Sequence, residues 1–324
     1  MNENQILLHI KDLRTYFYVK AGTVKAIDGV ELTLEKGTKL GLVGESGSGK
    51  TTMALAIMRM IRPPGTIEGQ ILMDGVDLLK LSEEEMRQTR LSKIAMIPQG
   101  AMNSLNPVMR IKDQIIDGMV DHGVKLDRNE KKKMVESLLN TVELPAKVAD
   151  LYPHELSGGM KQRVTVAISI ALHPKIVIAD EPTSALDVVI QRQVMETITR
   201  LAHDLDMSMI LIGHDMGLMA QSVDRLAVMY AGHLMEVGKV REMFAEPFHP
   251  YTQKLISSLP VLGRRGVFEG IAGIPPSVIN PAPGCPFQVR CAKKIGKICE
   301  DIFPQYQELR PGRFVACHLY GKVS

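Results

Sequence analysis

The sequence predicts an α/β fold in which a largely parallel β-sheet is covered by helices on both faces. Three short runs, at residues 94–97, 176–179 and 209–212, are apolar throughout rather than alternating, as in parallel strands that are buried on both sides. A further strand is predicted at residues 39–43, followed at once by a glycine-rich turn and an apolar-periodic helix. The 324 residues, 45% of them hydrophobic, can bury this core and a second, smaller unit.

The segments outside this core differ in composition. Residues 7–34 contain short β-like runs, and residues 107–153 lose the strand signals and predict helices at 112–122 and 129–141, a helical insertion. After about residue 251 prolines and glycines become frequent and disfavour regular elements. We therefore expect a main domain over residues 1–255 and a loop-rich extension over residues 256–324.

Charge and hydropathy exclude several classes of function. The formal net charge is only +3, from 39 basic and 36 acidic residues without long runs of one sign, so no nucleic-acid partner is expected. The N-terminus lacks a signal-peptide pattern, and no apolar run approaches the roughly 18–20 residues that span a bilayer. We expect a soluble, cytosolic chain whose membrane role would come through partners.

The glycine-rich turn fits the phosphate-binding pattern G-x-x-x-x-G-K-[ST]. Between a strand and a helix, its glycines let backbone N–H groups and the helix N-terminus point at phosphate oxygens. Lys50 is expected to reach the β- and γ-phosphates, and Thr51 to bind Mg²⁺. An ordinary glycine-rich turn is the alternative. The residues predicted to contact nucleotide here are Gly44, Ser46, Gly47, Ser48, Gly49, Lys50, Thr51 and Thr52.

Two acidic residues end the apolar run at residues 176–179. Asp180 is expected to reach Mg²⁺, directly or through water, and Glu181 to polarise the attacking water as a general base. Two acids that only cap the next helix are the alternative.

A third motif, residues 156–163 with the sequence LSGGMKQR, resembles the LSGGQ signature of the ATP-binding cassette (ABC) superfamily. Ser157, Gly158 and Gly159 precede a helical run and present backbone N–H groups suited to an anion. The resemblance implies that this loop binds the γ-phosphate of ATP held by a second subunit. Met160 replaces the commonest Gln, as it does in the peptide-importer branch that the sequence resembles.

Further residues match the superfamily's motifs in order. Gln99 resembles the Q-loop glutamine, which contacts Mg²⁺ or water; Asp187, in Ser184-Ala185-Leu186-Asp187, resembles the D-loop at the dimer interface; and His214 resembles the switch histidine. The resemblance implies a P-loop NTPase fold with a RecA-like core, an N-terminal antiparallel β subdomain and a helical subdomain. It also favours Phe17 as the ring that stacks on adenine, with Tyr16 and Tyr18 as ordinary strand residues.

Three short segments resemble the dipeptide/oligopeptide importer branch: residues 13–17, residues 102–107 and residues 249–252. This implies an ATPase at the cytoplasmic face of the cell membrane. The implied partners are a second, paralogous ATPase subunit, with a homodimer possible in isolation, two permease subunits and an extracytoplasmic substrate-binding protein. The alternatives are a soluble ABC ATPase that acts on nucleic acid or ribosomes, and an ATP-regulated iron–sulfur sensor.

All the cysteines lie in the last 40 residues, at Cys285, Cys291, Cys299 and Cys317. A proline-rich segment with few large apolar residues suggests that a bound metal stabilises its fold. Zinc, an iron–sulfur cluster, and free thiols or disulfides are the alternatives. Members of the peptide-importer branch with a similar tail carry a [4Fe–4S] cluster, so the resemblance implies four-cysteine ligation here, while His318 is expected to be an ordinary surface residue.

Overall fold

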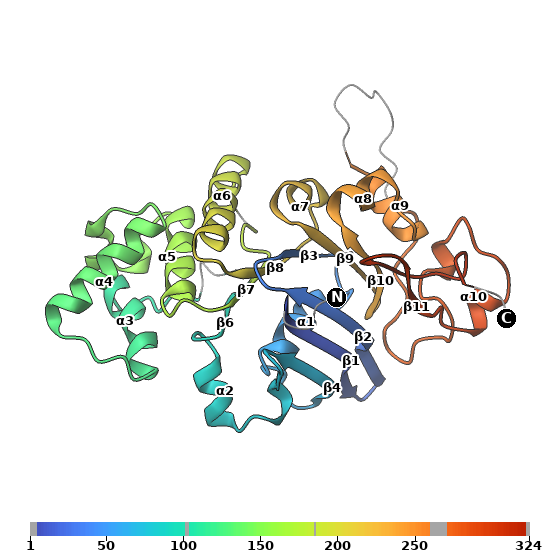
Figure 1. The fold of residues 1–324 in the computed structure, drawn as a ribbon, viewed down its shortest axis with the longest axis horizontal. Helices are drawn as coiled ribbons and strands as arrows, with labels where there is room; N and C mark the ends of the chain where they lie inside the picture. Colours follow the sequence, from blue (N-terminus) through green and yellow to red (C-terminus); the bar gives the residue numbers. More distant parts are fainter. Residues whose placement is uncertain (1–4, 101–103, 185, 260–270, 322–324) are drawn as a thin grey trace. The chain divides into compact units, whose positions relative to one another are not determined.

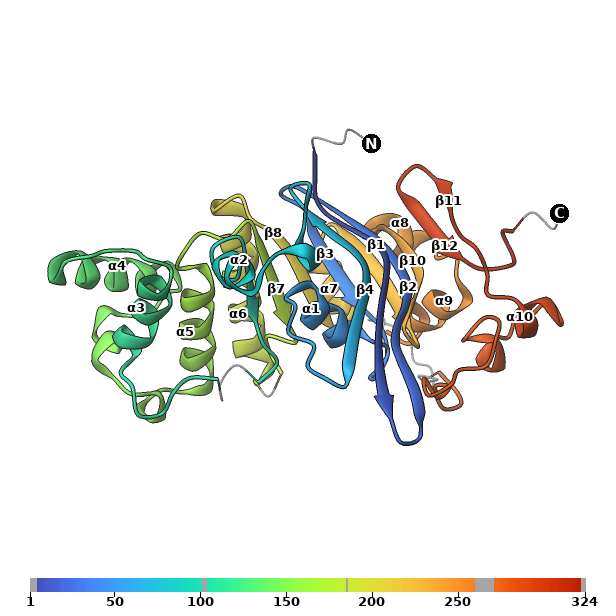
Figure 2. The same ribbon diagram turned by 90° about the horizontal axis from the view of Figure 1, so that it is seen from below.

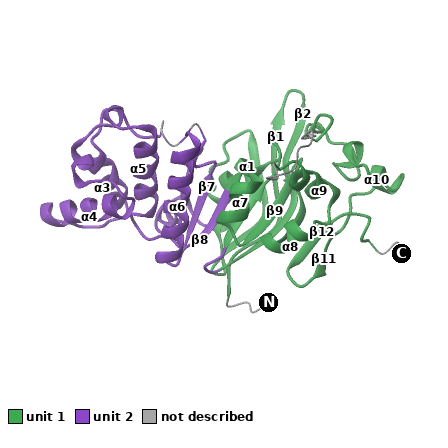
Figure 3. Cartoon of the chain, turned by 90° about the horizontal axis from the view of Figure 1, so that it is seen from above, with its two compact units in different colours: residues 1–35, 39–80, 212–324 green, residues 36–38, 81–211 purple. Residues whose placement is uncertain are grey.

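The structure is a computed structural model that describes residues 5–100, 104–184, 186–259 and 271–321. The chain divides into two compact units, shown in different colours in Figure 3. The first unit consists of residues 1–35, 39–80 and 212–324, and the second of residues 36–38 and 81–211. Three residues of the motifs described above lie outside the described residues: Met102 and Asn103 of the importer-like segment, and Ala185 of the D-loop-like motif.

The first unit contains two groups of strands with short helices. Its elements are β1 (Ile6–Val19), β2 (Gly22–Glu35), β3 (Lys39–Val43), α1 (Lys50–Ile57), β4 (Gly65–Met73), β5 (Val76–Asp77), η2 (Leu78–Lys80), α7 (Met216–Ser222), β9 (Arg225–Tyr230), β10 (His233–Lys239), α8 (Val240–Ala245), α9 (Pro250–Ser257), η6 (Gln288–Arg290), α10 (Ile298–Asp301), β11 (Tyr306–Arg310) and β12 (Arg313–Ala316).

An antiparallel sheet of order β2-β1-β4-β5 forms the N-terminal part of this unit. Its two 14-residue strands, β1 and β2, run side by side as a long hairpin in Figure 2. Leu8, Ile10 and Leu13 on β1 are buried to within 1%, so one face of the sheet carries the apolar core. The antiparallel N-terminal subdomain implied by the resemblance is therefore present.

The second group of strands has the order β11-β12-β10-β9-β3. Strands β3 and β9 are parallel, and the remaining neighbours are antiparallel. The hairpin of β11 and β12 was not predicted from the sequence. Pro311 and Gly312 form its turn, with Gly312 at φ 73°, and Val315 is fully buried against Phe248.

The second unit is an α/β arrangement with the parallel strand pair β6 and β7, in the order β8-β7-β6. Its elements are α2 (Glu83–Thr89), β6 (Ile94–Ile97), α3 (Ile111–Asp121), α4 (Arg128–Thr141), η4 (Ala146–Asp150), η5 (Pro153–Glu155), α5 (Gly158–Ile170), β7 (Ile176–Asp180), α6 (Val188–Asp204) and β8 (Ser208–Gly213). Figure 1 shows α3, α4 and α5 grouped in this unit. The predicted helices of residues 107–153 are α3 and α4.

Local sequence explains where these helices begin. Asp127 accepts hydrogen bonds from the N–H groups of Asn129 and Glu130, and the Glu130 carboxylate accepts one from the backbone N–H of Asp127, which completes a capping box at α4. Ser82 and Glu85 form the same arrangement at α2. Among the described residues, no helix is both long and apolar enough to cross a membrane.

Candidate functional site

The phosphate-binding pattern lies on the loop between β3 and α1, as predicted. Gly44, Gly47 and Gly49 have backbone φ angles of 154°, 76° and 103°, which residues other than glycine rarely adopt. A Cβ at Gly44 would collide with the carbonyl oxygen of Met229, and one at Gly49 with that of Ala26. The loop therefore needs glycine for both its conformation and its close packing.

Lys50 crosses this loop from the first turn of α1. Its Nζ donates to the carbonyl oxygens of Gly44 and Glu45, both at 2.8 Å, and to Ser48 Oγ at 3.3 Å. Ser48 and Lys50 are buried, whereas Ser46 and Gly47 at the tip are accessible. The concave loop thus has its cation and its helix N-terminus on one side, which suits an anionic ligand. Thr51 and Thr52 follow on the same helical turn.

The acidic pair of the second unit ends strand β7. Asp180 is fully buried, and Glu181 has a left-handed backbone with φ 43°. Because β6 and β7 are parallel and Ile97 pairs with Ala179, the two strands end at the same edge of the sheet. Gln99 and Glu181 therefore meet, and Gln99 Nε2 donates to Glu181 Oε2 at 2.9 Å.

The signature-like loop begins helix α5. Ser157 is the N-cap of the helix predicted here, and its Oγ accepts from the N–H of Met160 over a long distance of 3.4 Å. Gly158 and Gly159 form the first turn, and a Cβ at Gly159 would lie 2.7 Å from Ile190 Cγ2 on α6. The loop therefore approaches α6 closely only because glycine is there.

Asp187 and His214 each begin or precede a helix. Asp187 caps α6 by accepting from the N–H groups of Val189 and Ile190 at 3.1 and 3.0 Å. His214 is exposed and follows β8, next to Asp215, which caps α7. The two compact units thus divide the predicted residues: the first holds the phosphate loop and His214, and the second holds Gln99, Asp180, Glu181, the signature-like loop and Asp187.

The three aromatic residues near the N-terminus have different surroundings on β1. Tyr16 donates to Asp28 Oδ1 and lies under Lys25 Nζ, 5.4 Å from the ring centroid. Burial, followed by this carboxylate, raises the pKa of Tyr16 above its ordinary value. Phe17 is half-buried and packs on Gly65, and Tyr18 is 51% exposed. The stacking role of Phe17 stays a prediction.

The four cysteines lie in one region of the first unit and form no disulfide. Cys285 donates its backbone N–H to the carbonyl oxygen of Cys299 at 2.8 Å. Burial, then the neighbouring thiols, raises the pKa of Cys285 to about 12 and that of Cys317 to about 11. Within the described ranges, no three His, Cys, Asp or Glu side chains are arranged to hold a single metal ion.

Arg290 and its partners are functional candidates that sequence reasoning missed. Arg290 forms a two-pronged ion pair with Glu45 of the phosphate loop, at 2.6 and 2.9 Å, and this pairing raises the pKa of the guanidinium. Tyr251 Oη accepts from the backbone N–H of Glu45 at 2.9 Å. Glu45 and Arg290 are 245 positions apart, so no local pattern joins them.

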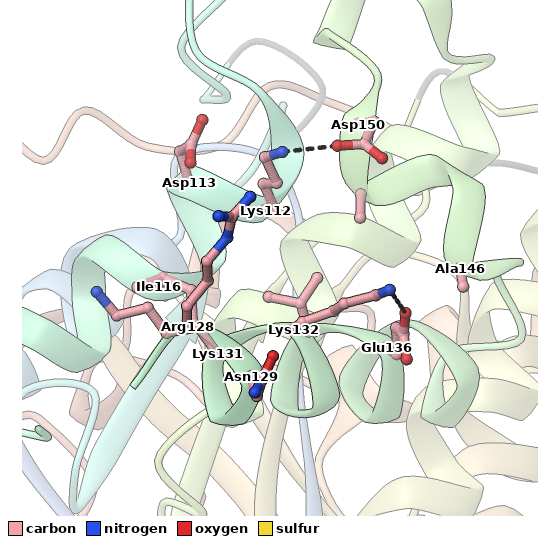
Figure 4. A pocket seen from close by; sticks show the side chains of 12 residues that line it. Lys112, Asp113, Ile116, Arg128, Asn129, Lys131, Lys132, Glu136, Ala146 and Asp150 are labelled. Carbon is pink, nitrogen blue, oxygen red and sulfur yellow. Dashed lines mark hydrogen bonds and ion pairs between the residues drawn. The ribbon is translucent and has the colours of Figure 1, made fainter. Parts of the chain in front are cut away.

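The helices and strands of the second unit also line cavities. One, of about 580 Å³ between α3, α4 and η4, has a mixed charge, with ion pairs Lys112–Asp150 and Lys132–Glu136 at its rim (Figure 4). Another, of about 430 Å³, is lined by Pro98, next to Gln99, and by Ser104, Leu105 and Asn106 of the importer-like segment. The second cavity is the one adjacent to a predicted site residue.

Comparisons with protein families match most of the chain. The family described as "ABC transporter" matches residues 27–184, and the one described as "Oligopeptide/dipeptide transporter, C-terminal region" matches residues 235–299. The second match contains Arg290 and three of the four cysteines.

Individual relatives extend over nearly the whole sequence. The oligopeptide transport ATP-binding protein AppF of Bacillus subtilis (strain 168) is 40% identical over 328 residues, covering 98% of both chains. The oligopeptide transport ATP-binding protein OppD of the same organism is 46% identical over 289 residues, covering 88% of this chain and 81% of its own. The dipeptide transport ATP-binding protein DppD of that organism is 41% identical over 303 residues, 92% of this chain and 90% of its own.

Solved structures show the same fold. A bacterial ABC transporter cassette solved as a dimer superposes with a TM-score of 0.66 at 25% identity, covering 72% of this chain and 99% of that one. A dimeric post-hydrolysis state bound to ADP and phosphate gives 0.65 at the same identity and coverage.

Proposed function

Because this chain belongs to the ABC transporter family, among its oligopeptide and dipeptide transport ATP-binding proteins, we propose that it powers the import of dipeptides or oligopeptides through a membrane transporter. Membership of this family makes the chain an ATPase whose hydrolysis is coupled to transport. The observation that carries the proposal is the glycine-lined phosphate loop, joined in one chain to the transporter-specific C-terminal region.

The phosphate loop suits a nucleotide because its glycines leave the space that side chains would fill. Lys50, which now bonds to loop carbonyl oxygens, is the cation that would turn to the β- and γ-phosphates. Backbone N–H groups of residues 44–52, including those of Ser46, Ser48 and Thr52, would supply the remaining phosphate contacts. Phe17 would stack on adenine.

Thr51, Gln99 and Asp180 would hold Mg²⁺, an ion that prefers oxygen ligands. The ion would neutralise phosphate charge when bound. Glu181 would orient and deprotonate the attacking water, and its hydrogen bond from Gln99 already orients that carboxylate. His214 would contact the γ-phosphate from the end of β8.

A second ATPase subunit would complete each site, through the loop of Ser157, Gly158 and Gly159 and through Asp187. The long Ser157 cap leaves the backbone N–H groups at the start of α5 weakly engaged, which suits an added anion. We propose that this subunit is a paralogue, that the pair attaches to two permease subunits at the cytoplasmic face of the membrane, and that a substrate-binding protein delivers cargo outside. The cavity beside Gln99 is the proposed permease contact.

Replacing Glu181 by Gln tests the hydrolytic mechanism. Since glutamine keeps the shape but cannot accept a proton, we expect ATP binding to persist while turnover falls by about 100-fold or more. Turnover would be measured with the partner ATPase present, and Glu196→Gln, an exposed glutamate on α6, is the control. Wild-type turnover in Glu181→Gln would contradict the general-base assignment.

Purification in membranes tests the transport role. We expect the chain to co-purify with multi-spanning permeases and to stimulate uptake of short peptides in reconstituted vesicles. Association with ribosomes or nucleic acid, and no stimulated uptake, would favour a soluble ABC ATPase instead.

We further propose that Cys285, Cys291, Cys299 and Cys317 hold a [4Fe–4S] cluster, which when bound would cross-link the tail. Four free thiols in one region, three of them buried and that of Cys291 half-buried, support this proposal. Protein purified without oxygen should absorb visible light through sulfur-to-iron charge transfer. Colourless protein that contains one zinc per chain would contradict the cluster assignment and indicate a zinc site instead.

A further inference from the structure

The segment from Cys285 to Cys291 lies against the phosphate loop. It is anchored first by Phe287, which is 1% exposed. The Phe287 ring packs edge-on against Tyr230, with centroids 5.3 Å apart, and lies tilted against Tyr251, with centroids 5.2 Å apart. These contacts hold the segment on β9 and α9. Strand β9 pairs with β3, and Tyr251 of α9 contacts Glu45 of the phosphate loop.

Arg290, one residue before Cys291, is the second anchor. All three of its guanidinium nitrogens are engaged. Nη1 donates to Glu45 and to Tyr230 Oη at 3.0 Å, Nη2 donates to Glu45 and to the Ile271 carbonyl at 2.8 Å, and Nε donates to the Ala272 carbonyl at 2.9 Å. The Arg290 side chain is 4% exposed and that of Glu45 is 25% exposed, so the pair is largely shielded from solvent and its two-pronged geometry is specific.

Glu45 is held at each of its polar groups. Its backbone N–H donates to Tyr251, its carbonyl accepts from Lys50, and its carboxylate accepts from Arg290. Arg290 is thus two hydrogen bonds away from the lysine of the phosphate loop. A movement of the cysteine region would therefore shift Arg290 and change the position of the Glu45 carboxylate.

The charge of Glu45 makes this contact consequential. A carboxylate within the phosphate loop repels a polyphosphate ligand unless a cation neutralises it. We propose that Arg290 is a positioning residue of the ATP site, through which the cysteine region sets the affinity for nucleotide. The inference rests on the proposed role of the phosphate loop.

The first experiment measures the Kd of MgATP for the purified full-length chain. Arg290→Ala should weaken binding about tenfold, because a charged hydrogen-bonded pair is lost and Glu45 is left uncompensated. Arg290→Lys, which keeps the charge but not the two-pronged geometry, should fall between wild type and Arg290→Ala. Arg310→Ala is the matched control, since Arg310 lies in the same tail and forms an exposed ion pair with Glu246 in which both side chains are 56% exposed; this variant should bind MgATP like wild type.

Removing the carboxylate separates electrostatics from packing. In the Glu45→Gln, Arg290→Ala double variant, no uncompensated charge remains, so the Kd should return to within about threefold of wild type. Wild-type binding by Arg290→Ala would overturn the proposal. A double variant that binds as weakly as Arg290→Ala would overturn it as well, because Arg290 would then act by packing alone.

The second experiment tests transmission from the cysteine region. Replacing all four cysteines by serine should weaken MgATP binding in the wild-type background and add nothing in the Arg290→Ala background. An equal loss in both backgrounds would overturn the proposal, because the effect would not pass through Arg290. Lys50→Ala tests the proposed function separately: if it binds MgATP like wild type, the phosphate-loop assignment fails, whatever Arg290 does.

Discussion

At the scale of single residues, the structure pairs charges that lie far apart in the sequence. Arg313 of β12 donates to Glu236 of β10 at 2.6 Å, and both side chains are at most 1% exposed. Glu236 also accepts from the backbone N–H groups of Phe248 and His249. The pair therefore connects the hairpin of β11 and β12 to the segment that includes Tyr251. Tyr251 in turn contacts Glu45 of the phosphate loop.

Replacing Arg313 by Ala should lower the free energy of unfolding by about 3–5 kcal/mol, because it leaves a buried carboxylate without its cation. Urea denaturation followed by circular dichroism measures this. Arg310→Ala, which breaks an exposed pair at the last residue of β11, should leave the midpoint unchanged. A midpoint for Arg313→Ala within error of wild type would show that the pair contributes nothing.

His249 should make the protein sensitive to acid. Burial holds its pKa at about 3 in the folded chain, where its Nδ1 accepts from the N–H of Tyr251. In the unfolded chain the imidazole binds a proton below about pH 6.5. Between these values the unfolded state binds one more proton, so stability present above pH 6.5 falls by up to about 1.4 kcal/mol per unit as the pH drops.

His249→Asn, which keeps an N-cap acceptor for α9, should show a shallower loss of stability between pH 6.5 and 4. Denaturant midpoints at four pH values in this range would measure the slope. An unchanged slope would assign the acid sensitivity to other groups.

At the scale of elements, helix starts divide into those that stabilise the fold and those that stay available to a ligand. Asp127 makes two cap hydrogen bonds, at 2.7 and 2.9 Å, whereas Ser157 makes one at 3.4 Å. The α5 start therefore gains little stability from its cap.

Ser157→Ala should lower the free energy of unfolding by about 0.5 kcal/mol, at the low end for a cap, yet reduce ATP turnover about tenfold or more with the partner present. Asp127→Ala should do the reverse, costing about 1 kcal/mol with turnover unchanged. Thermal unfolding and phosphate release on the same samples provide both readouts. Equal effects on turnover in the two variants would remove the ligand role of the α5 start.

At the scale of the whole molecule, the predicted function requires two ATPase subunits. Val188 and Val189 are 79% and 66% exposed at the start of α6, directly after Asp187, and we propose that they lie in the interface with the second subunit. A solved relative of the same fold is a dimer.

The Glu181→Gln chain should therefore form a dimer with MgATP and be monomeric without it, as measured by light scattering after gel filtration. Adding Val188→Asp should weaken this dimer at least tenfold, since a charge would be buried at the interface. Val108, equally exposed at 79%, provides the control substitution Val108→Asp. Dimerisation that is insensitive to Val188→Asp would place the interface elsewhere.

The sequence by itself determined the core strands, the helices of residues 107–153, the phosphate loop and the family. Each of these depends on local information: continuous apolar runs, helical periodicity, and glycines in a fixed pattern. Two of these glycines, Gly44 and Gly49, lie where the structure leaves no room for a side chain. The family resemblance supplied the predicted role of Gln99 as the Q-loop glutamine. The parallel register of β6 and β7 explains why Gln99 contacts Glu181.

Only the tertiary structure decided how the cysteine-containing tail relates to the phosphate loop. The proline-rich composition predicted loops, yet a hairpin with a buried arginine closes the tail. Arg290 and Glu45 each look like surface charges in sequence, and their pairing depends on a chain path of 245 residues. Long-range pairs of this kind leave no periodic pattern, because they depend on where whole elements pack rather than on neighbouring residues.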